Sequence, residues 1–197
     1  MDRFCKMCTL SQERALREVL DELDALLAGL DDLQKLSLIY QLLTDTVTYD
    51  CDFRNNAYGV LRSRRGACDD ISQALVIMAG HCCHDSAVFR IIGKCSGPGG
   101  GHAWNIVELS TPRGRGVWFL DPTFDLGEKK WNYFLVGGKK LRDEGRKWFP
   151  DRFPPVSETN SPLKRYRDPV KEKALLAWFT GLETRMKPAV PLRFWRT

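Results

Sequence analysis

Three residue types that together carry out nucleophilic acyl transfer follow one another along this chain. Cys68 lies in the run GACDD, His102 in the run GHAW and Asp121 in the run DPT. A cysteine thiolate attacks a carbonyl carbon, an imidazole carries the proton, and a carboxylate orients the imidazole. No single run is specific, because cysteine is often buried and Asp-Pro is often a turn. Together they predict a cysteine-dependent acyl-transfer site.

The segment after Cys68 is expected to be a helix buried in the core. Residues 71–79 are apolar nearly all round, and Gly80 is expected to end the helix. Gly66 allows an unusual backbone conformation at the turn before the cysteine. The free amides and positive dipole end of such a helix lower the pKa of the thiol and receive an oxyanion. The backbone amide of Cys68 is therefore one expected oxyanion donor.

Three segments with strand composition follow this helix, at residues 87–92, 102–109 and 117–120. Glycine-rich or Pro-Arg-Gly turns separate them, and strands that follow helices in this way predict an α+β fold with an antiparallel sheet. His102 begins the second segment and Asp121 follows the third. On neighbouring strands the Asp121 carboxylate would reach the second ring nitrogen of His102 and orient the imidazole.

Helical periodicity marks the N-terminal part of the chain. A helix capped by Thr9 or Ser11 is expected to run to about Gly29, and a second helix follows over about residues 33–43. These N-terminal helices are expected to pack against each other. Residues 50–65 are polar and irregular, so we expect a loop that leads into the cysteine-containing turn.

The domain organisation is predicted to be one catalytic domain, 1–136, with a basic, proline-containing C-terminal extension, 137–197, packed on it. Prolines make residues 150–169 an extended arm or a wrapped loop. Asp168 and Pro169 form a typical cap and first turn for a final helix. The aromatic residues near the C-terminus are expected to dock on the domain.

Composition limits the kinds of partner and the cellular location that we expect for this protein. No stretch reaches the roughly 20 apolar residues of a membrane helix, and no secretory segment is visible, so we expect a soluble, cytoplasmic protein without a membrane partner. The seven cysteines are an odd number, which favours reduced thiols. The net charge of +5 comes from residues 137–197. A solvated basic face is favoured there over binding to nucleic acid or an acidic protein, because no nucleic-acid motif accompanies it.

Two cysteine clusters raise the question of a zinc site. Cys5 and Cys8 are separated by two residues, and residues 81–84 read HCCH. The second spacing is not an established ligand pattern, and adjacent cysteines seldom reach one ion. We therefore expect no metal and no cofactor, and we expect buried or oxidisable thiols.

The runs around the three reactive residues resemble the transglutaminase-like superfamily, and its bacterial members in particular. They are GACDDISQAL at 66–75, GHAWNIVEL at 101–109 and WFLDPTFD at 118–125. The resemblance implies a nucleophile at Cys68 and a general base and acid at His102, with an orienting carboxylate at Asp121. It also implies a papain-like α+β core, with the cysteine on a helix packed against the sheet.

Residues that bind substrate are less marked. In the family a side-chain donor to the oxyanion lies upstream of the cysteine, and Tyr58, Asn55 and Asn56 are the candidates here. Asp69 could shape the substrate pocket, although acidic residues are common in a first helical turn because of the dipole. Trp104 could line the acyl groove, although aromatic residues on strands more often belong to the core.

The sequence predicts an enzyme that acts on a protein or peptide substrate through a thioester on Cys68. Water as the acceptor gives a cysteine peptidase or amide hydrolase, which we favour because large crosslinking transglutaminases carry extra β domains. The alternatives are a glutamine deamidase, a protein-glutamine transglutaminase with an amine acceptor, and a binding or scaffold module without turnover. The acceptor depends on groove shape and water exclusion, which sequence does not encode locally.

Overall fold

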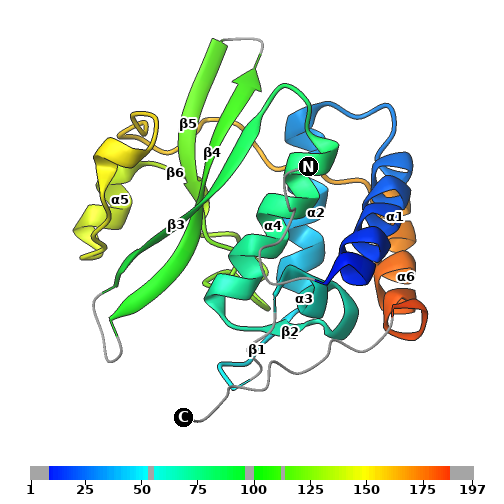
Figure 1. The fold of residues 1–197 in the computed structure, drawn as a ribbon. Coiled ribbons are helices and arrows are strands. Elements are labelled where there is room, and N and C mark those ends of the chain that lie inside the picture. The colour runs from blue at the N-terminus through cyan, green and yellow to red at the C-terminus, as the bar shows by residue number, and fades with distance from the viewer. Residues whose placement is uncertain (1–8, 53–55, 96–99, 112–113, 187–197) are drawn as a thin grey trace, which may run out of the picture.

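The computed structural model describes residues 9–52, 56–95, 100–111 and 114–186. Helix α4, Cys68–Cys82, is at the centre of the fold. In Figure 1 it lies between the sheet on one side and helix α1 on the other. It contacts α1, α2, α3 and strands β3 and β4. The helices are α1 Leu10–Leu26, α2 Asp32–Thr46, α3 Ala57–Ser63, α4, α5 Gly138–Asp143 and α6 Pro169–Arg185, with one 3₁₀ turn, Pro150–Arg152. The buried helix predicted after Cys68 is therefore confirmed.

Four antiparallel strands form the main sheet in the order β3-β4-β5-β6. They are β3 Ala87–Lys94, β4 Gly101–Thr111, β5 Gly114–Leu120 and β6 Phe134–Val136. This confirms an α+β fold with an antiparallel sheet. The last residue of β5, Leu120, pairs with Asn105, so the start of β4 pairs with β3 alone. Because β5 is the shorter strand, one edge of β4 is left open between Gly101 and Trp104.

The two faces of the sheet are covered by different layers. Val107 and Leu109 face the helices and join the large core. Trp104 and Ile106 point the other way, into a smaller core that includes Leu141 of α5. Figure 1 shows α5 on the side of the sheet away from α4. The sheet is therefore buried on both faces near the start of β4.

Two short strands pair in parallel immediately before α4. The pairing joins β1, Thr48–Tyr49, to β2, Arg65–Gly66, with Tyr49 opposite Gly66. A Cβ on Gly66 would lie 2.9 Å from Val60 Cγ2 and 2.9 Å from Asp70 Cβ. Gly66 is required by this close approach and not by a positive φ, since its φ is not positive. The expected reason for the glycine is thereby corrected.

Caps define the outer helices as the sequence indicated. Thr9 caps α1 with a capping box, and Asp31 does the same for α2. The Asp168 carboxylate accepts from the amides of Val170 and Lys171 at the start of α6. Helix α6 packs on α1, α2 and α3, so this part of the extension joins the helical layer. The division into a 1–136 domain and a 137–197 extension stays a prediction.

Two predictions about local structure are wrong. Part of the expected loop at residues 50–65 is helix α3, which Asn56 caps by accepting from the Gly59 amide. Its residues Tyr58 and Val60 are buried in the large core, and that packing stabilises a turn the local sequence does not favour. Helix α4 also continues past Gly80 to Cys82, because Cys82 is buried and an isolated glycine is tolerated within a helix.

The expected extended arm is largely confirmed. Beyond its single 3₁₀ turn, it runs along the sheet and α5 without helix or strand up to α6. Backbone hydrogen bonds hold the arm against the sheet. The Ser157 amide donates to Val117 O at 2.8 Å, and the Ser161 amide donates to Leu135 O at 2.9 Å. Among the described residues, no helix is both long and apolar enough to cross a bilayer. The C-terminal aromatic residues expected to dock lie outside the described residues.

Replacing Tyr40 by Phe should lower the free energy of unfolding by about 1–3 kcal/mol. The buried Tyr40 hydroxyl donates to Asp125 Oδ2 at 2.7 Å, and Asp125 also accepts from the amides of Asn132 and Tyr133. The variant removes one donor from a buried carboxylate. Urea unfolding monitored by circular dichroism measures the change. Tyr166→Phe, at a half-buried tyrosine, is the matched control and should cost less than about 0.5 kcal/mol; equal losses in the two variants would contradict this role for Tyr40.

Candidate active site

Cys68 is the first residue of α4 and its thiol is free and part-buried. The thiol hydrogen-bonds to the His102 side chain and accepts from the amides of Ala103 and Asp69. Ala103 belongs to the part of β4 that β5 does not reach. Burial acts to raise the pKa of Cys68, but the contacts with His102 and the two amides outweigh it, so this pKa lies below its ordinary value. The site thus favours a thiolate.

His102 links the thiol to a buried carboxylate. Its Nε2 lies 2.7 Å from Asp121 Oδ2, and His102 and Asp121 are 8% and 1% exposed. Burial acts to lower the pKa of His102, yet the hydrogen bonds to Asp121 and Cys68 raise it to about 9. Because Nε2 is engaged by Asp121, Nδ1 is the nitrogen left for the thiol. The structure therefore brings the three predicted residues into one hydrogen-bonded series.

Asp121 is held by more than the histidine. Its Oδ1 accepts from the Phe124 amide at 3.2 Å, and its own amide donates to Tyr133 O at 3.0 Å. Its Oδ2 also accepts from Arg146 Nη1 at 2.5 Å. The carboxylate is therefore fixed from three directions without contact with solvent.

Arg146 was expected to belong to a solvated basic face, and this is wrong. It is only 4% exposed and forms an ion pair with Asp121. Its sequence neighbours Arg142 and Lys147 are exposed, as expected. No local signal separates Arg146 from them, because its burial depends on a partner far away in the chain. Arg146 is therefore one residue of the candidate site that the sequence did not reveal.

Tyr49 is a second residue that sequence reasoning missed. Its hydroxyl makes hydrogen bonds with the thiol and with the backbone of Cys68, and burial and this thiol raise the pKa of Tyr49. The pairing of Tyr49 with Gly66, two residues before the cysteine, explains the approach. Tyr49 follows helix α2 directly on a two-residue strand, and that pairing has no sequence signature. The hydroxyl therefore lies beside the Cys68 amide.

The residues predicted to contact substrate have varied positions. Tyr58 is fully buried in the large core, Asn56 caps α3, and Asn55 lies outside the described residues. Asp69 is exposed and pairs with Arg90 at 2.7 Å. Trp104 is fully buried and stacks on the His102 ring at 5.6 Å between centroids. Trp104 thus supports the imidazole of His102 from within the smaller core.

An exposed aromatic ring borders the histidine on its other side. Phe124 is 45% exposed, and its centroid lies 4.9 Å from that of His102 in an edge-on arrangement. Phe124 follows Asp121 closely in the chain, so the loop that holds the carboxylate also supplies this ring. Its exposed face is positioned to contact a substrate.

The side chains of the HCCH run at residues 81–84 do not form a common site. His81 Nε2 lies 3.0 Å from Asp21, while Cys82 and Cys83 are buried. Burial raises the pKa of Cys82 to about 12 and also raises that of Cys83, so both thiols stay protonated at neutral pH. Over the described part of the chain, no three His, Cys, Asp or Glu side chains are grouped so as to hold a metal ion. Cys5 and Cys8 lie outside it.

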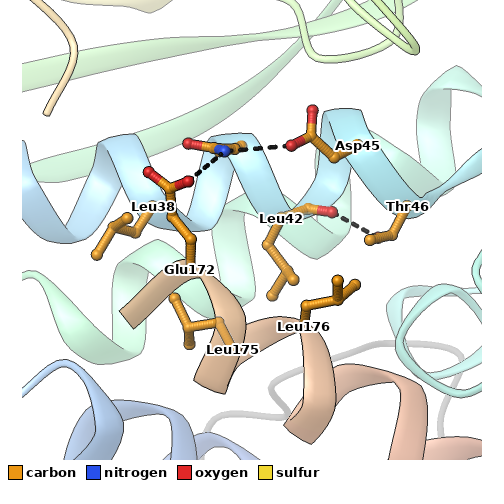
Figure 2. A pocket seen from close by; sticks show the side chains of 8 residues that line it. Leu38, Leu42, Asp45, Thr46, Glu172, Leu175 and Leu176 are labelled. Atoms are coloured by element: carbon orange, nitrogen blue, oxygen red, sulfur yellow. Dashed lines mark hydrogen bonds between the residues drawn. The ribbon is translucent and has the colours of Figure 1, made fainter. Parts of the chain in front are cut away.

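A separate pocket lies between α2 and α6 (Figure 2). Leucines form its apolar part, and the Gln41 amide donates to the carboxylates of Asp45 and Glu172. Its lining is Leu38, Gln41, Leu42, Asp45, Thr46, Glu172, Leu175 and Leu176. The predicted triad lies on α4, β4 and the end of β5, so this pocket belongs to a different part of the fold.

A small electrophile such as iodoacetamide should alkylate Cys68 much faster than the other thiols at pH 7. The thiolate fraction sets the rate, and the pKa of Cys68 is lowered whereas burial raises those of Cys82, Cys83 and Cys95. Peptide mass mapping over time gives the rate of each cysteine, and the midpoint of the Cys68 rate against pH should lie below 8.5. Cys68→Ala should abolish the fast phase. A Cys68 rate no higher than that of Cys5 would contradict a catalytic thiol.

Comparison with known proteins assigns no family to this geometry. No protein-family model matches the chain, and no curated protein matches it. The resemblance to the transglutaminase-like superfamily therefore rests on the sequence runs around Cys68, His102 and Asp121. Any proposal about function therefore depends on the arrangement of these three side chains.

Proposed function

We propose that this chain is a cysteine-dependent acyl-transfer enzyme of transglutaminase-like type that hydrolyses amides of peptides or of glutamine side chains. The observation that carries the proposal is the Cys68–His102–Asp121 series, in which His102 and Asp121 are buried and Cys68 is part-buried. Within it the pKa of the thiol is lowered and that of the imidazole is raised. A scaffold without turnover has no need of such a pair. A papain-like arrangement of the core and a cytoplasmic location are parts of the same proposal.

The first half-reaction uses the thiolate and the imidazolium together. The Cys68 sulfur attacks the amide carbon, and the carbonyl oxygen becomes an oxyanion that the Cys68 amide and the Tyr49 hydroxyl can stabilise. When the C–N bond breaks, the imidazolium of His102 gives its proton to the leaving amine. An amine and a thioester on Cys68 result. Asp121 keeps the ring in the required orientation throughout.

The second half-reaction resolves the thioester. Neutral His102 takes a proton from water, the hydroxide adds to the thioester carbon, and the carboxylic acid leaves as the thiolate re-forms. The part-buried position of Cys68 supports access of water. An amine in the same place would give transglutamination, and water acting on a glutaminyl thioester gives deamidation. Peptide hydrolysis is the outcome we favour.

A peptide library incubated with the protein, with and without a primary amine, distinguishes these outcomes by mass spectrometry. We expect backbone cleavage, whereas deamidation adds about one mass unit to a glutamine and transglutamination adds the amine. The Cys68→Ala variant is the control and should give no product. If wild type and Cys68→Ala leave every peptide unchanged, the enzyme proposal is wrong.

The pH dependence of kcat/KM should follow from the same pair. His102 has its pKa raised to about 9, so the imidazolium needed to protonate the leaving amine is present below that pH. We therefore expect kcat/KM to decline as the pH rises through about 9. The low-pH decline should follow the lowered pKa of Cys68. A profile that falls near pH 6.5 would contradict a raised His102 pKa.

Tyr49→Phe should lower kcat about 10- to 1,000-fold with a much smaller change in KM, because an oxyanion donor acts in the transition state. The ring and its exposed position are retained, and only the hydroxyl beside the Cys68 amide is lost. Steady-state kinetics on the best library peptide measures the effect. Tyr166→Phe is the control and should keep wild-type rates; a Tyr49→Phe enzyme with unchanged kcat would remove Tyr49 from the oxyanion site.

A further inference from the structure

We propose that Arg146 is a positioning residue of this active site: it holds the Asp121 carboxylate in the orientation in which Oδ2 receives His102 Nε2. The inference rests on the proposed function, since it assigns a role within that site. Arg146 acts through Asp121 and does not itself contact the thiol or a reacting atom.

Asp121 Oδ2 is shared by the two cationic partners. His102 Nε2 lies 2.7 Å from it, and Arg146 Nη1 lies 2.5 Å from it. The other oxygen, Oδ1, accepts from the Phe124 amide. The χ2 angle of aspartate is broad, so each further contact narrows the orientations of the carboxylate. The guanidinium adds to the restraint from His102 and the Phe124 amide because it approaches Oδ2 from another direction.

The guanidinium is itself held in place by aromatic rings. Its central carbon lies 4.4 Å from the centroid of Phe124, 4.7 Å from that of Tyr133 and 5.6 Å from that of Trp104. Trp104 and Phe124 are also the two rings that contact His102. Arg146 and His102 therefore share one aromatic enclosure around Asp121.

The backbone of Arg146 is equally fixed. Its amide donates to Leu141 O at 2.9 Å, just after the left-handed turn at Gly145. The next residue, Lys147, exchanges two backbone hydrogen bonds of 2.9 Å with Lys94 at the end of β3. Lys147 thus forms an isolated antiparallel β-bridge at the end of β3. This bridge fixes the backbone next to Arg146, whose side chain lies near Trp104 and pairs with Asp121.

Stability alone is a poor explanation for this buried pair. Burying two charges costs about as much as their attraction returns, and replacement of such pairs by apolar residues is often neutral or stabilising. Arg146 Nη2 is moreover buried and finds no hydrogen-bond partner among the described residues, which adds to the cost. A buried arginine that satisfies only part of its donors is better explained by what it does to Asp121.

Charge gives Arg146 a second effect on the site. The titratable groups around the guanidinium are Asp121, Glu144, whose Oε2 lies 3.9 Å from Nε, and the side chains of Cys95 and Tyr133. Of these, Asp121 is the one that also binds His102. The positive charge therefore offsets the carboxylate that His102 faces. Without Arg146, His102 would meet an uncompensated buried anion, which would hold its proton more tightly.

The test compares Arg146→Met and Arg146→Lys in the full chain, with Arg142→Met as the matched control at an exposed arginine. For Arg146→Met we expect the pKa of His102, followed by NMR of the imidazole signals, to rise by about one unit. We expect kcat/KM at pH 7 to fall about 10- to 100-fold through lost orientation. Arg146→Lys should keep the His102 pKa near that of wild type, because it retains the charge. Arg142→Met should change neither quantity.

Two results would overturn the proposal. One is a folded Arg146→Met protein in which both the His102 pKa and kcat/KM equal those of wild type. The other comes from Asp121→Asn, to which Arg146→Met is added. If Arg146 acts through Asp121, the addition should change the remaining activity less than about twofold, whereas a full second loss would place its action elsewhere. The double variant buries no charge at either position, so it also serves if Arg146→Met alone does not fold.

These readouts separate the two proposals. The NMR comparison of His102 needs no turnover, so it decides on Arg146 even if the wild-type protein acts on no amide tested. A wild-type protein with a reactive Cys68 and amide hydrolysis, but with a His102 pKa and a kcat/KM that are both unaffected by Arg146→Met, would keep the enzyme and reject the positioning role.

Discussion

The structure depends most on one buried carboxylate. Asp121 has almost no contact with solvent, so its charge must be met entirely by protein donors. The donors come from three places: His102 on β4, the Phe124 amide in the loop after β5, and Arg146 beyond α5. Together these donors occupy both oxygens of the carboxylate. The fold around the site can be understood as the set of elements that delivers these donors to a single point.

The position of the candidate site follows from the unequal lengths of strands β4 and β5. Strand β5 ends at Leu120 while β4 extends further, which leaves the Ala103 amide free to donate to the Cys68 thiol. The N-terminus of α4 arrives at the same place because Gly66 lets the chain pass close to Val60 and Asp70. Helix dipole, strand amide and imidazole thus converge on one sulfur. Convergence of this kind makes a thiolate stable at neutral pH.

The same environment explains why the other described cysteines differ from Cys68. Cys82 and Cys83 lie at the opposite end of α4, where burial outweighs the opposing charge of Lys35 and raises the pKa of both thiols. The contrast within one helix shows that burial by itself suppresses a thiolate, whereas burial with directed donors stabilises it. His102 shows the converse, since burial lowers its pKa and Asp121 more than restores it. The pKa values of Cys68 and His102 are therefore determined by their hydrogen-bond partners and not by burial alone.

The sequence by itself determined the central helix, three of the four strands of the main sheet and the capped outer helices, because each is encoded in local periodicity and turn residues. It also indicated Cys68, His102 and Asp121, since their flanking runs are distinctive together. It missed helix α3, and it misplaced the C-terminal end of α4, because burial of Tyr58 and of Cys82 decided both. Only the tertiary structure revealed Tyr49 and Arg146 as members of the site. Tyr49 is placed by the parallel pairing of two two-residue strands, and Arg146 by the β-bridge between its neighbour Lys147 and Lys94. Contacts between residues far apart in the chain have no local pattern, so the second partner of Asp121 could be found only in the folded protein.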